Sequence, residues 1–382
     1  MFTYHLVILT IIILSVQMVR SEKKHRIIFI DLMRALAVIQ MVQGHTVDVL
    51  LAPEYRLTEY PAFFIWNFMR GMTAPIFMFS AGTVFTYLFR LVPEPFEQNP
   101  RVGKGIKRFF LLVGLGYLLR YPTYKIIDFS DVTPDRWNTF FTVDVLHLIG
   151  FGILLVIICA FIAEKLKLND MLVFTIFSLI FFVATPFVNK INWISIFPQP
   201  VAGYLYDKTG SFFPLFPWAG YVIMGGVLGS YLAKNPLVFK TSKFSINLAI
   251  FGSAFIIISL LSVYISKKYF GLPYEDSSYS LEVITFRIGF VLLLNSVVSY
   301  ISQKIESIPR IIILIGRNTL LIYVVHLMIL YGSAWNPGII LLFGSSLNVS
   351  YTIFSALTMI TLMTLMVVSL NKLKFRNKQL VT

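Results

Sequence analysis

Nine ionisable side chains fall inside long apolar stretches of this 382-residue chain. They are Asp31, Arg34, His45, Arg70, Asp144, His147, Arg287, Arg317 and His326. An ionisable group costs about 2.5–3.5 kcal/mol at the centre of a membrane helix, so it marks a place that binds, reacts or pairs. Histidine suits acid–base chemistry, and arginine suits the binding of phosphate and carboxylate groups. These nine residues are therefore the candidate functional residues.

Three of the nine residues, Asp31, Arg34 and His45, repeat with helical spacing. The step from Arg34 to His45 returns to within about 20° of the same helix face, and Asp31 lies about 40° from that face. Asp31 and Arg34 are one turn apart and are expected to pair. The sequence therefore predicts one polar stripe along the first helix. Such a stripe either carries chemistry or only joins neighbouring membrane helices.

The composition defines the class of protein that carries these residues. Hydrophobic residues make up 57% of the chain, charged residues only 13%, and the mean hydropathy is +0.79. A soluble protein has roughly 25% charged residues, so a soluble enzyme, a disordered chain and an ordinary nucleic-acid-binding domain are excluded. The single cysteine, Cys159, excludes an intramolecular disulfide and a cysteine-built metal site. We therefore predict a membrane protein without a metal cofactor.

Ten apolar stretches approach the roughly 20 residues that a membrane-spanning helix needs. They cover residues 27–51, 62–89, 109–121, 143–163, 171–188, 212–232, 244–266, 284–301, 311–332 and 350–370. Long uninterrupted apolar runs exclude the alternating pattern of a transmembrane β-barrel. We predict an all-α polytopic membrane protein with about ten transmembrane helices, or eleven if residues 3–19 also span. Residues 27–370 are expected to form a single membrane domain, between the apolar, basic-flanked segment 1–26 and a basic tail, 371–382.

The distribution of lysine and arginine orients these helices. If the basic run at residues 20–26 is cytoplasmic, alternate loops place 20 basic residues on the cytoplasmic side and 8 on the opposite side. An excess of lysine and arginine marks cytoplasmic loops, so we predict a plasma-membrane protein with a cytoplasmic C-terminus. The net charge of +14 then reflects topology. The lipid bilayer is an expected partner, nucleic acid is not, and assembly into a homo-oligomer is left open.

This orientation divides the nine candidate residues into two layers. Asp31, Arg34 and Arg317 fall near the cytoplasmic ends of their helices. The outer layer holds His45, Arg70, Asp144, His147, Arg287 and His326. Two polar layers, one reachable from each side, predict a reaction or a transport process that connects two compartments.

The segment from Asp31 to His45 resembles the D-x-x-R-x(10)-H signature in the first helix of integral-membrane acyltransferases. Other stretches resemble one branch, the heparan-α-glucosaminide N-acetyltransferase-like proteins. These stretches are Arg70-Gly-Met-Thr-Ala-Pro, Asp144-Val-Leu-His, Phe216-Pro-Trp-Ala-Gly and Gly316-Arg-Asn-Thr. The resemblance therefore extends over most of the chain.

The resemblance implies a membrane enzyme that takes an acyl group, usually acetyl, from cytosolic coenzyme A. The enzyme would pass this group to an amino or hydroxyl group of an extracytoplasmic sugar or cell-envelope glycan. His45 matches the histidine to which the superfamily assigns catalysis. The heparan enzyme itself lacks a histidine at this helix position and uses one slightly further along. Here Asp48 follows His45, with no second histidine nearby, so heparan is not carried over as the substrate.

The resemblance and the two layers together suggest a role for each candidate residue. His45 is the predicted general base and Arg70 steadies the developing oxyanion, so both are catalytic candidates. The predicted binding residues for acetyl-CoA, the acyl donor, are Asp31, Arg34 and Arg317. The predicted substrate-binding residues are Asp144, His147, Arg287 and His326. Direct attack on the thioester and an acetyl-imidazole intermediate both stay open.

The alternative function is a secondary transporter or exporter of a small polar solute. It would explain the same two polar layers. Secondary transporters commonly contain inverted repeats and helices broken by glycine or proline, and the sequence has no visible internal symmetry of that kind. Coenzyme-dependent chemistry by the purified protein would distinguish the enzyme from the transporter.

Overall fold

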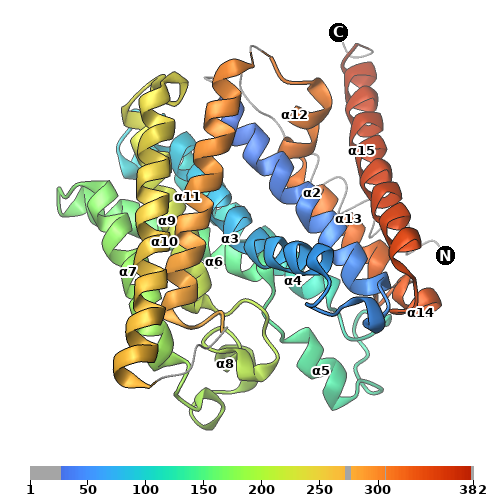
Figure 1. Ribbon diagram of the computed structural model, residues 1–382. Helices are drawn as coiled ribbons and strands as arrows, with labels where there is room; N and C mark the ends of the chain where they lie inside the picture. The colour runs from blue at the N-terminus through green and yellow to red at the C-terminus, as the bar shows by residue number, and fades with distance from the viewer. Residues whose placement is uncertain (1–26, 272–276, 306, 380–382) are drawn as a thin grey trace. The chain divides into compact units, whose positions relative to one another are not determined.

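The computed structural model describes residues 27–271, 277–305 and 307–379, and this part is almost entirely helical (Figure 1). The helices are α2 (Ile28–Leu50), α3 (Pro61–Arg90), α4 (Pro100–Leu119), α5 (Pro134–Phe140), α6 (Val145–Lys165), α7 (Asp170–Val188), α8 (Gln199–Ala202), α9 (Leu215–Lys234), α10 (Ser242–Phe270), α11 (Leu281–Lys304), α12 (Arg310–Arg317), α13 (Thr319–Leu330), α14 (Ile340–Phe343) and α15 (Val349–Gln379). Strands β1 (Gly332–Ser333) and β2 (Asn336–Pro337) form a small antiparallel pair. The predicted all-α class is confirmed. The apolar segment 3–19 lies outside the described residues.

Seven helices in the described part of the chain are long and apolar enough to cross a membrane, and α12 with α13 adds an eighth if the pair is one span. All ten predicted stretches are helical, but α2 and α4 are not among these seven. The polar stripe on α2 and the four basic residues of α4 make both helices less apolar. The count of about ten transmembrane helices therefore stays a prediction.

The predicted span 311–332 is not one continuous helix. The stretch consists of α12 and α13, which meet at a 75° bend. Asn318 lies at the bend: its side-chain amide donates to the Leu314 carbonyl (2.7 Å), and its own carbonyl accepts the Ile322 N–H (3.0 Å). An asparagine side chain can replace a backbone hydrogen bond and so end a helix. Asn318 thus ends α12 and starts α13.

The chain divides into two compact units. One unit contains the described residues up to Thr73 together with those from Ile305 onward, and the other is Ala74–Lys304. In the first unit, α2 packs against α12, α13 and α15 (Figure 1). Gly316 allows this close approach, because a Cβ atom there would lie 2.7 Å from the Asp31 carbonyl oxygen. The single membrane domain 27–370 remains a prediction.

In the unit Ala74–Lys304, helices pack in pairs: α10 with α11, α7 with α9, and α4 with α6 (Figure 1). Small residues let the first pair approach closely, because a Cβ atom at Gly252 would lie 2.8 Å from the Gly289 carbonyl oxygen. Only 17% of the apolar window of α10 is buried. A long apolar helix with so little protein around it has the surface that lipid requires.

A buried carboxylate ties three helix ends together in the same unit. Asp170 is the first residue of α7 and accepts a hydrogen bond from Ser230 Oγ at 2.5 Å. Its carboxylate also lies 2.9 Å from Arg90 Nε and pairs with Lys234 Nζ. Arg90 and Lys234 are the last residues of α3 and α9. Asp170 therefore joins the start of α7 to the ends of two neighbouring helices.

Helix α15 runs to Gln379, nine residues beyond the predicted span end at residue 370. Most of the basic tail predicted for residues 371–382 is therefore a continuation of this helix. The apolar stretch marks only the part of a helix that suits a membrane, and lysine and arginine are good helix formers that can extend it.

Candidate functional site

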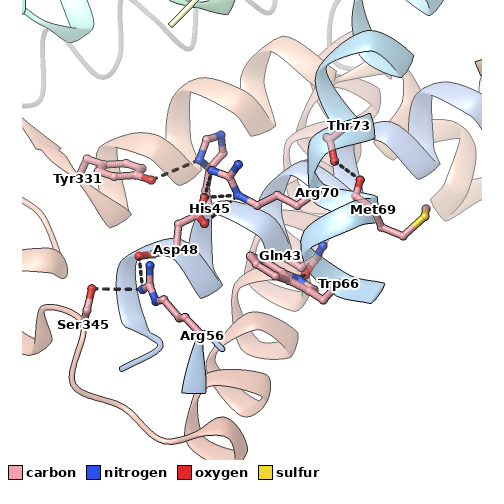
Figure 2. A network of polar contacts seen from close by, with 10 residues as sticks. All are labelled: Gln43, His45, Asp48, Arg56, Trp66, Met69, Arg70, Thr73, Tyr331 and Ser345. Atoms are coloured by element: carbon pink, nitrogen blue, oxygen red, sulfur yellow. Dashed lines mark hydrogen bonds and ion pairs between the residues drawn. The ribbon is translucent and has the colours of Figure 1, made fainter. Parts of the chain in front are cut away.

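His45 lies near the C-terminal end of α2, half-buried, and faces Tyr331 just beyond α13 (Figure 2). His45 Nδ1 is 3.3 Å from the Tyr331 phenol oxygen. The two rings meet edge to face, with centroids 5.9 Å apart. The hydrogen bond at one nitrogen of a histidine determines which nitrogen carries the proton. The Tyr331 contact at Nδ1 therefore affects whether Nε2 can accept a proton.

His326 on α13 packs against His45, with ring centroids 5.5 Å apart. The side chain is fully buried, and its Nδ1 lies 2.7 Å from the Ile322 carbonyl oxygen. Because a carbonyl can only accept, Nδ1 carries the proton and the neutral ring holds its lone pair on Nε2. That Nε2 is buried and has no hydrogen-bond partner among the described residues. His326 thus lies beside His45, inside the protein.

Arg70 on α3 binds the carboxylate of Asp48, which follows His45 by one turn on α2 (Figure 2). Arg70 Nε lies 2.8 Å from Asp48 Oδ1 and 2.7 Å from Oδ2, and Nη2 makes a further contact with Oδ2. Such a two-point ion pair fixes the plane of the guanidinium group. The Arg70 side chain remains 43% exposed. Arg70 is therefore held at the end of α2 that carries His45, with N–H groups left for a bound molecule.

Arg56 stabilises the end of α2 (Figure 2). Its Nε donates to the Leu51 carbonyl at 3.0 Å, and Nη2 donates to the Asp48 carbonyl at 2.8 Å. The last carbonyls of a helix lack partners within the helix, and a cation there also interacts favourably with the helix dipole. Nη2 also lies 3.3 Å from the hydroxyl of Ser345. Arg56 therefore fixes the backbone that positions Asp48 and, one turn earlier, His45.

Two amide side chains hold the first turns of α3 against α2. Trp66 Nε1 donates to Gln43 Oε1 at 2.8 Å (Figure 2), and Gln40 Nε2 donates to the Met69 carbonyl at 2.5 Å. These bonds lie one turn apart on α2 and one turn apart on α3. Arg70 follows Met69 directly, so the same contacts set where its side chain leaves the helix.

The N-terminal half of α2 holds a second group of predicted residues. Arg34 Nη2 lies 3.3 Å from the hydroxyl of Thr319, the first residue of α13. Arg317, at the end of α12, is exposed. Gly316 lies against the Asp31 backbone, as described above. The break at Asn318 therefore brings both predicted basic residues of the inner layer, Arg34 and Arg317, to the start of α13.

Asp144 and His147 lie in the unit Ala74–Lys304, where they begin α6. Asp144 accepts the Leu146 N–H at 2.9 Å, and the ring of His147 lies within 3.2 Å of the Asp144 N–H and 3.1 Å of its carboxylate. This reciprocal arrangement is a capping box. Both side chains are buried, and Arg120 Nε lies 3.4 Å from the Asp144 carboxylate. The pair is thus built into the helix start.

Two tyrosines enclose His147 from one side. The ring of Tyr117 packs edge-on against His147 with centroids 4.4 Å apart, and its hydroxyl lies 2.9 Å from that of Tyr204. Burial and the hydrogen bond with Tyr117 raise the pKa of Tyr204. Tyr204 therefore stays neutral at physiological pH. The surroundings of His147 are thus aromatic and uncharged apart from Asp144 and Arg120.

Arg287 on α11 lies over the ring of Trp218 on α9, with its guanidinium carbon 5.3 Å from the ring centroid. Its Nε and Nη1 are buried without a hydrogen-bond partner among the described residues. The contact with Trp218 is a cation–π interaction, which stabilises the positive charge. Arg287 thus retains unused donors inside the protein. Close to Arg287, burial and the carboxylate of Asp207 raise the pKa of Tyr279.

The first unit holds predicted residues in two places. His45, Arg70 and His326 lie at the C-terminal end of α2, and Arg34 lies toward its N-terminal end beside Thr319, two residues after Arg317. Sequence reasoning missed Asp48 and Tyr331. Asp48 could have been found, since it follows His45 at the i+3 spacing that places two residues on one helix face. Tyr331 gave no signal because a tyrosine at a helix end is ordinary.

No group of three histidine, cysteine or carboxylate residues that could hold a metal ion occurs in the described ranges. The polar groups around His45 are two imidazoles, one phenol and one arginine–carboxylate pair. These groups can accept or donate protons and bind oxygen-rich groups.

Comparison with known proteins identifies the family to which the chain belongs. The family model described as heparan-alpha-glucosaminide N-acetyltransferase, catalytic, matches residues 26–269. This range includes α2 with its polar stripe and both partners of the Asp48–Arg70 pair. His326 and Tyr331 lie outside the match. No curated protein is similar enough to count as a match.

Proposed function

Because the chain belongs to the heparan-alpha-glucosaminide N-acetyltransferase catalytic family, whose members are acetyltransferases acting on glycans, we propose that it transfers acetyl from cytosolic acetyl-CoA to an extracytoplasmic sugar. The acceptor group is an amine or a hydroxyl of a sugar or cell-envelope glycan. The observation that carries this proposal is α2, which presents His45 beside Tyr331 and His326 at one end and Arg34 beside Thr319 at the other.

The inner end of α2 is the proposed coenzyme site. Arg34 and Arg317 supply two guanidinium groups near the start of α13. The N-terminal end of a helix carries a partial positive charge and free N–H groups, and arginine suits phosphate. Asp31 is proposed to hold Arg34 in place from one turn away. Phosphates bound there would lie on the cytoplasmic side in the proposed orientation.

The outer end of α2 is the proposed reaction site. Arg34 and His45 are eleven residues apart, which corresponds to about 16 Å along a helix. Coenzyme A is an extended molecule with its phosphates and its thioester at opposite ends, so it can contact both places. The distance between the two ends of the stripe therefore supports a coenzyme bound along α2.

In the proposed reaction, neutral His45 removes a proton from the acceptor amine or hydroxyl as that group attacks the thioester carbonyl carbon. Negative charge develops on the carbonyl oxygen, and Arg70 supplies N–H groups to it. The carbon–sulfur bond then breaks, and the coenzyme A thiolate takes the proton from His45. Asp48 keeps Arg70 in position through its two-point contact. No metal is needed for this sequence of steps.

The remaining predicted substrate residues have different proposed roles. His326 is buried behind His45 and supports it. Asp144 and His147 cap α6 and are proposed to act on the acceptor through the position of that helix. Arg287 has unused N–H groups and is proposed to bind the acceptor directly.

The location of the protein and its binding partners are also proposals. The basic asymmetry of the loops supports a plasma-membrane protein with a cytoplasmic C-terminus. Acetyl-CoA, the sugar acceptor and the bilayer are the proposed partners.

One observation favours the transporter as a second candidate. The bent pair α12 and α13 is the kind of discontinuous helix that lines the binding sites of secondary transporters. A transporter would bind a solute at the break without cleaving acetyl-CoA. The assay that tests the enzyme therefore also separates the two functions.

The test compares wild type with His45→Asn in detergent, following release of coenzyme A thiol from acetyl-CoA with D-glucosamine as the probe acceptor. Both proteins carry Cys159→Ser, so that the only thiol in the assay is that of released coenzyme A. His45→Asn should lower turnover by about 10²- to 10⁴-fold, the usual contribution of a positioned base. Asparagine keeps a polar contact but cannot take the proton. Mass spectrometry of cell-envelope glycans, with and without the gene, identifies natural acceptors.

Equal turnover in wild type and His45→Asn would remove His45 from the mechanism. The acetyltransferase function would be rejected if the wild-type protein released no thiol and produced no acetylated glycan. Binding of a solute without chemistry would favour the transporter.

A further inference from the structure

Two features of the His45 surroundings are not explained by the base alone. The nitrogen that contacts Tyr331 is Nδ1, and His326 packs against the same ring. Tyr331 is anchored by its own backbone, whose N–H donates to the Leu327 carbonyl at 2.8 Å. A neutral phenol beside Nδ1 of a catalytic imidazole influences which of the two ring nitrogens carries the proton.

The hydrogen bond can run in two directions. If the Tyr331 hydroxyl donated to Nδ1, the neutral ring would carry its proton on Nε2 and could not accept one there. If Nδ1–H donates to the Tyr331 oxygen, the lone pair lies on Nε2. Only the second arrangement makes Nε2 of His45 a base. The Tyr331 side chain is 42% exposed, so its hydroxyl hydrogen can turn away from His45.

Resting on the proposed function, we propose that Tyr331 is a positioning residue that accepts the His45 Nδ1–H and so directs the Nε2 lone pair to the acceptor. When Nε2 takes the acceptor proton, the ring becomes positively charged and its Nδ1–H becomes a stronger donor. The hydrogen bond to Tyr331 therefore strengthens during the reaction. His326 packs against the same ring and limits its rotation.

A nucleophile, a base and a third group that orients the base form a recurring catalytic arrangement. Here the nucleophile is the acceptor amine or hydroxyl, the base is His45 and the orienting group is a phenol oxygen in place of the usual carboxylate. The nearest carboxylate on α2, Asp48, is already occupied by Arg70. This assignment explains why the site uses Tyr331 for the orienting contact.

Tyr331→Phe keeps the ring and removes only the oxygen. We expect kcat for acetyl transfer to D-glucosamine to fall by about 10- to 100-fold, the range found when a group that orients a functional histidine is lost. The KM for acetyl-CoA should change by less than about twofold, because the coenzyme phosphates are proposed to lie at the other end of α2. Tyr351→Phe, an exposed tyrosine of the same unit, is the matched control and should behave as wild type.

A double variant separates positioning from a structural role. In the His45→Asn background, Tyr331→Phe should cause no further loss, since the tyrosine acts only through the imidazole. If Tyr331→Phe unfolds in detergent, Tyr331→Gln and Tyr331→Leu replace it, and the glutamine variant should be the faster because its amide oxygen can accept the Nδ1–H. Unchanged kcat, a rise in KM alone, losses that multiply in the double variant, or equal rates for glutamine and leucine would each overturn the proposal. If the proposed function itself is wrong, the wild-type protein will release no thiol. This result distinguishes that failure from failure of the Tyr331 assignment.

Discussion

Arg34 and Arg70 carry similar groups but have different surroundings. Arg70 is neutralised by Asp48 in a two-point ion pair. The hydrogen bond of Arg34 that reaches α13 goes to a neutral hydroxyl, that of Thr319. Arg70 is therefore a fixed group beside His45. Arg34 lies beside the start of α13, where we propose that it contacts the coenzyme.

Arg34→Ala tests this assignment. Hydrogen bonds to charged groups contribute about 1.5–3 kcal/mol, so the affinity for acetyl-CoA should fall by about 10- to 100-fold. Arg34→Lys keeps the charge but not the planar group, and it should recover part of the loss. Isothermal titration of acetyl-CoA into the purified protein measures both.

Lys372→Ala, an exposed basic residue on the same predicted side, is the control and should bind acetyl-CoA normally. The assignment is wrong if Arg34→Ala keeps both its thermal midpoint and its acetyl-CoA affinity. A structural role for Arg34 predicts instead a lower thermal midpoint or poor expression.

At the scale of elements, helix ends do most of the positioning. Arg56 satisfies the last carbonyls of α2 near His45, and Asn318 divides one apolar stretch into α12 and α13 beside Arg34. Asp144 and His147 begin α6. Arg56 and Asp144 bind backbone groups that would otherwise lack a partner. Three candidate residues, Arg317, Asp144 and His147, thus lie at helix ends.

Asp170 offers a test of this organisation. Asp170→Asn removes the charge that faces Arg90 and Lys234 and leaves two cations at one place. Breaking a buried ion pair costs about 3–5 kcal/mol. Because the Lys234 side chain is 46% exposed, water compensates part of this loss and we expect about 2–3 kcal/mol. Thermal unfolding in detergent should show a lower midpoint.

Asp135→Asn provides the matched control, since Asp135 is exposed on α5 and its side chain has no ion pair in the described part of the chain. A midpoint for Asp170→Asn equal to that of the control would show that the three helix ends do not depend on this carboxylate.

At the scale of the whole molecule, the basic residues define a topology that can be tested by labelling. In a Cys159→Ser background, Glu94→Cys and Tyr124→Cys place single thiols in the two exposed segments that flank α4. The basic asymmetry predicts that residue 94 faces the cytoplasm and residue 124 faces outward. An impermeant thiol reagent added to intact cells should label only the cysteine at residue 124.

Labelling after permeabilisation confirms that both thiols are accessible. Labelling of residue 94 in intact cells would reverse or reject the topology, and with it the proposal that acetyl-CoA enters at Arg34. This result would leave the chemistry at His45 untouched, because the family match and the polar contacts do not depend on orientation.

The sequence by itself determined the class, the helical stretches and the family. Length and hydropathy suffice for these, because a helix satisfies its own backbone and its apolar residues record the bilayer directly. The spacing of Asp31, Arg34 and His45 also predicted one stripe, since helix geometry is regular. The family motif rests on the same short segment, whose residues α2 keeps on one element.

Only the tertiary structure decided which residues meet. The contact of His45 with Tyr331 joins residues 286 positions apart, and that of Arg34 with Thr319 joins residues 285 apart. Such pairs depend on how α13 packs against α2, which no local pattern encodes. The bend at Asn318 was missed because its hydrophobic pattern continues through the break. Periodicity reports which residues suit a helix, whereas packing and the hydrogen bonds of single polar side chains decide where that helix ends and what it faces.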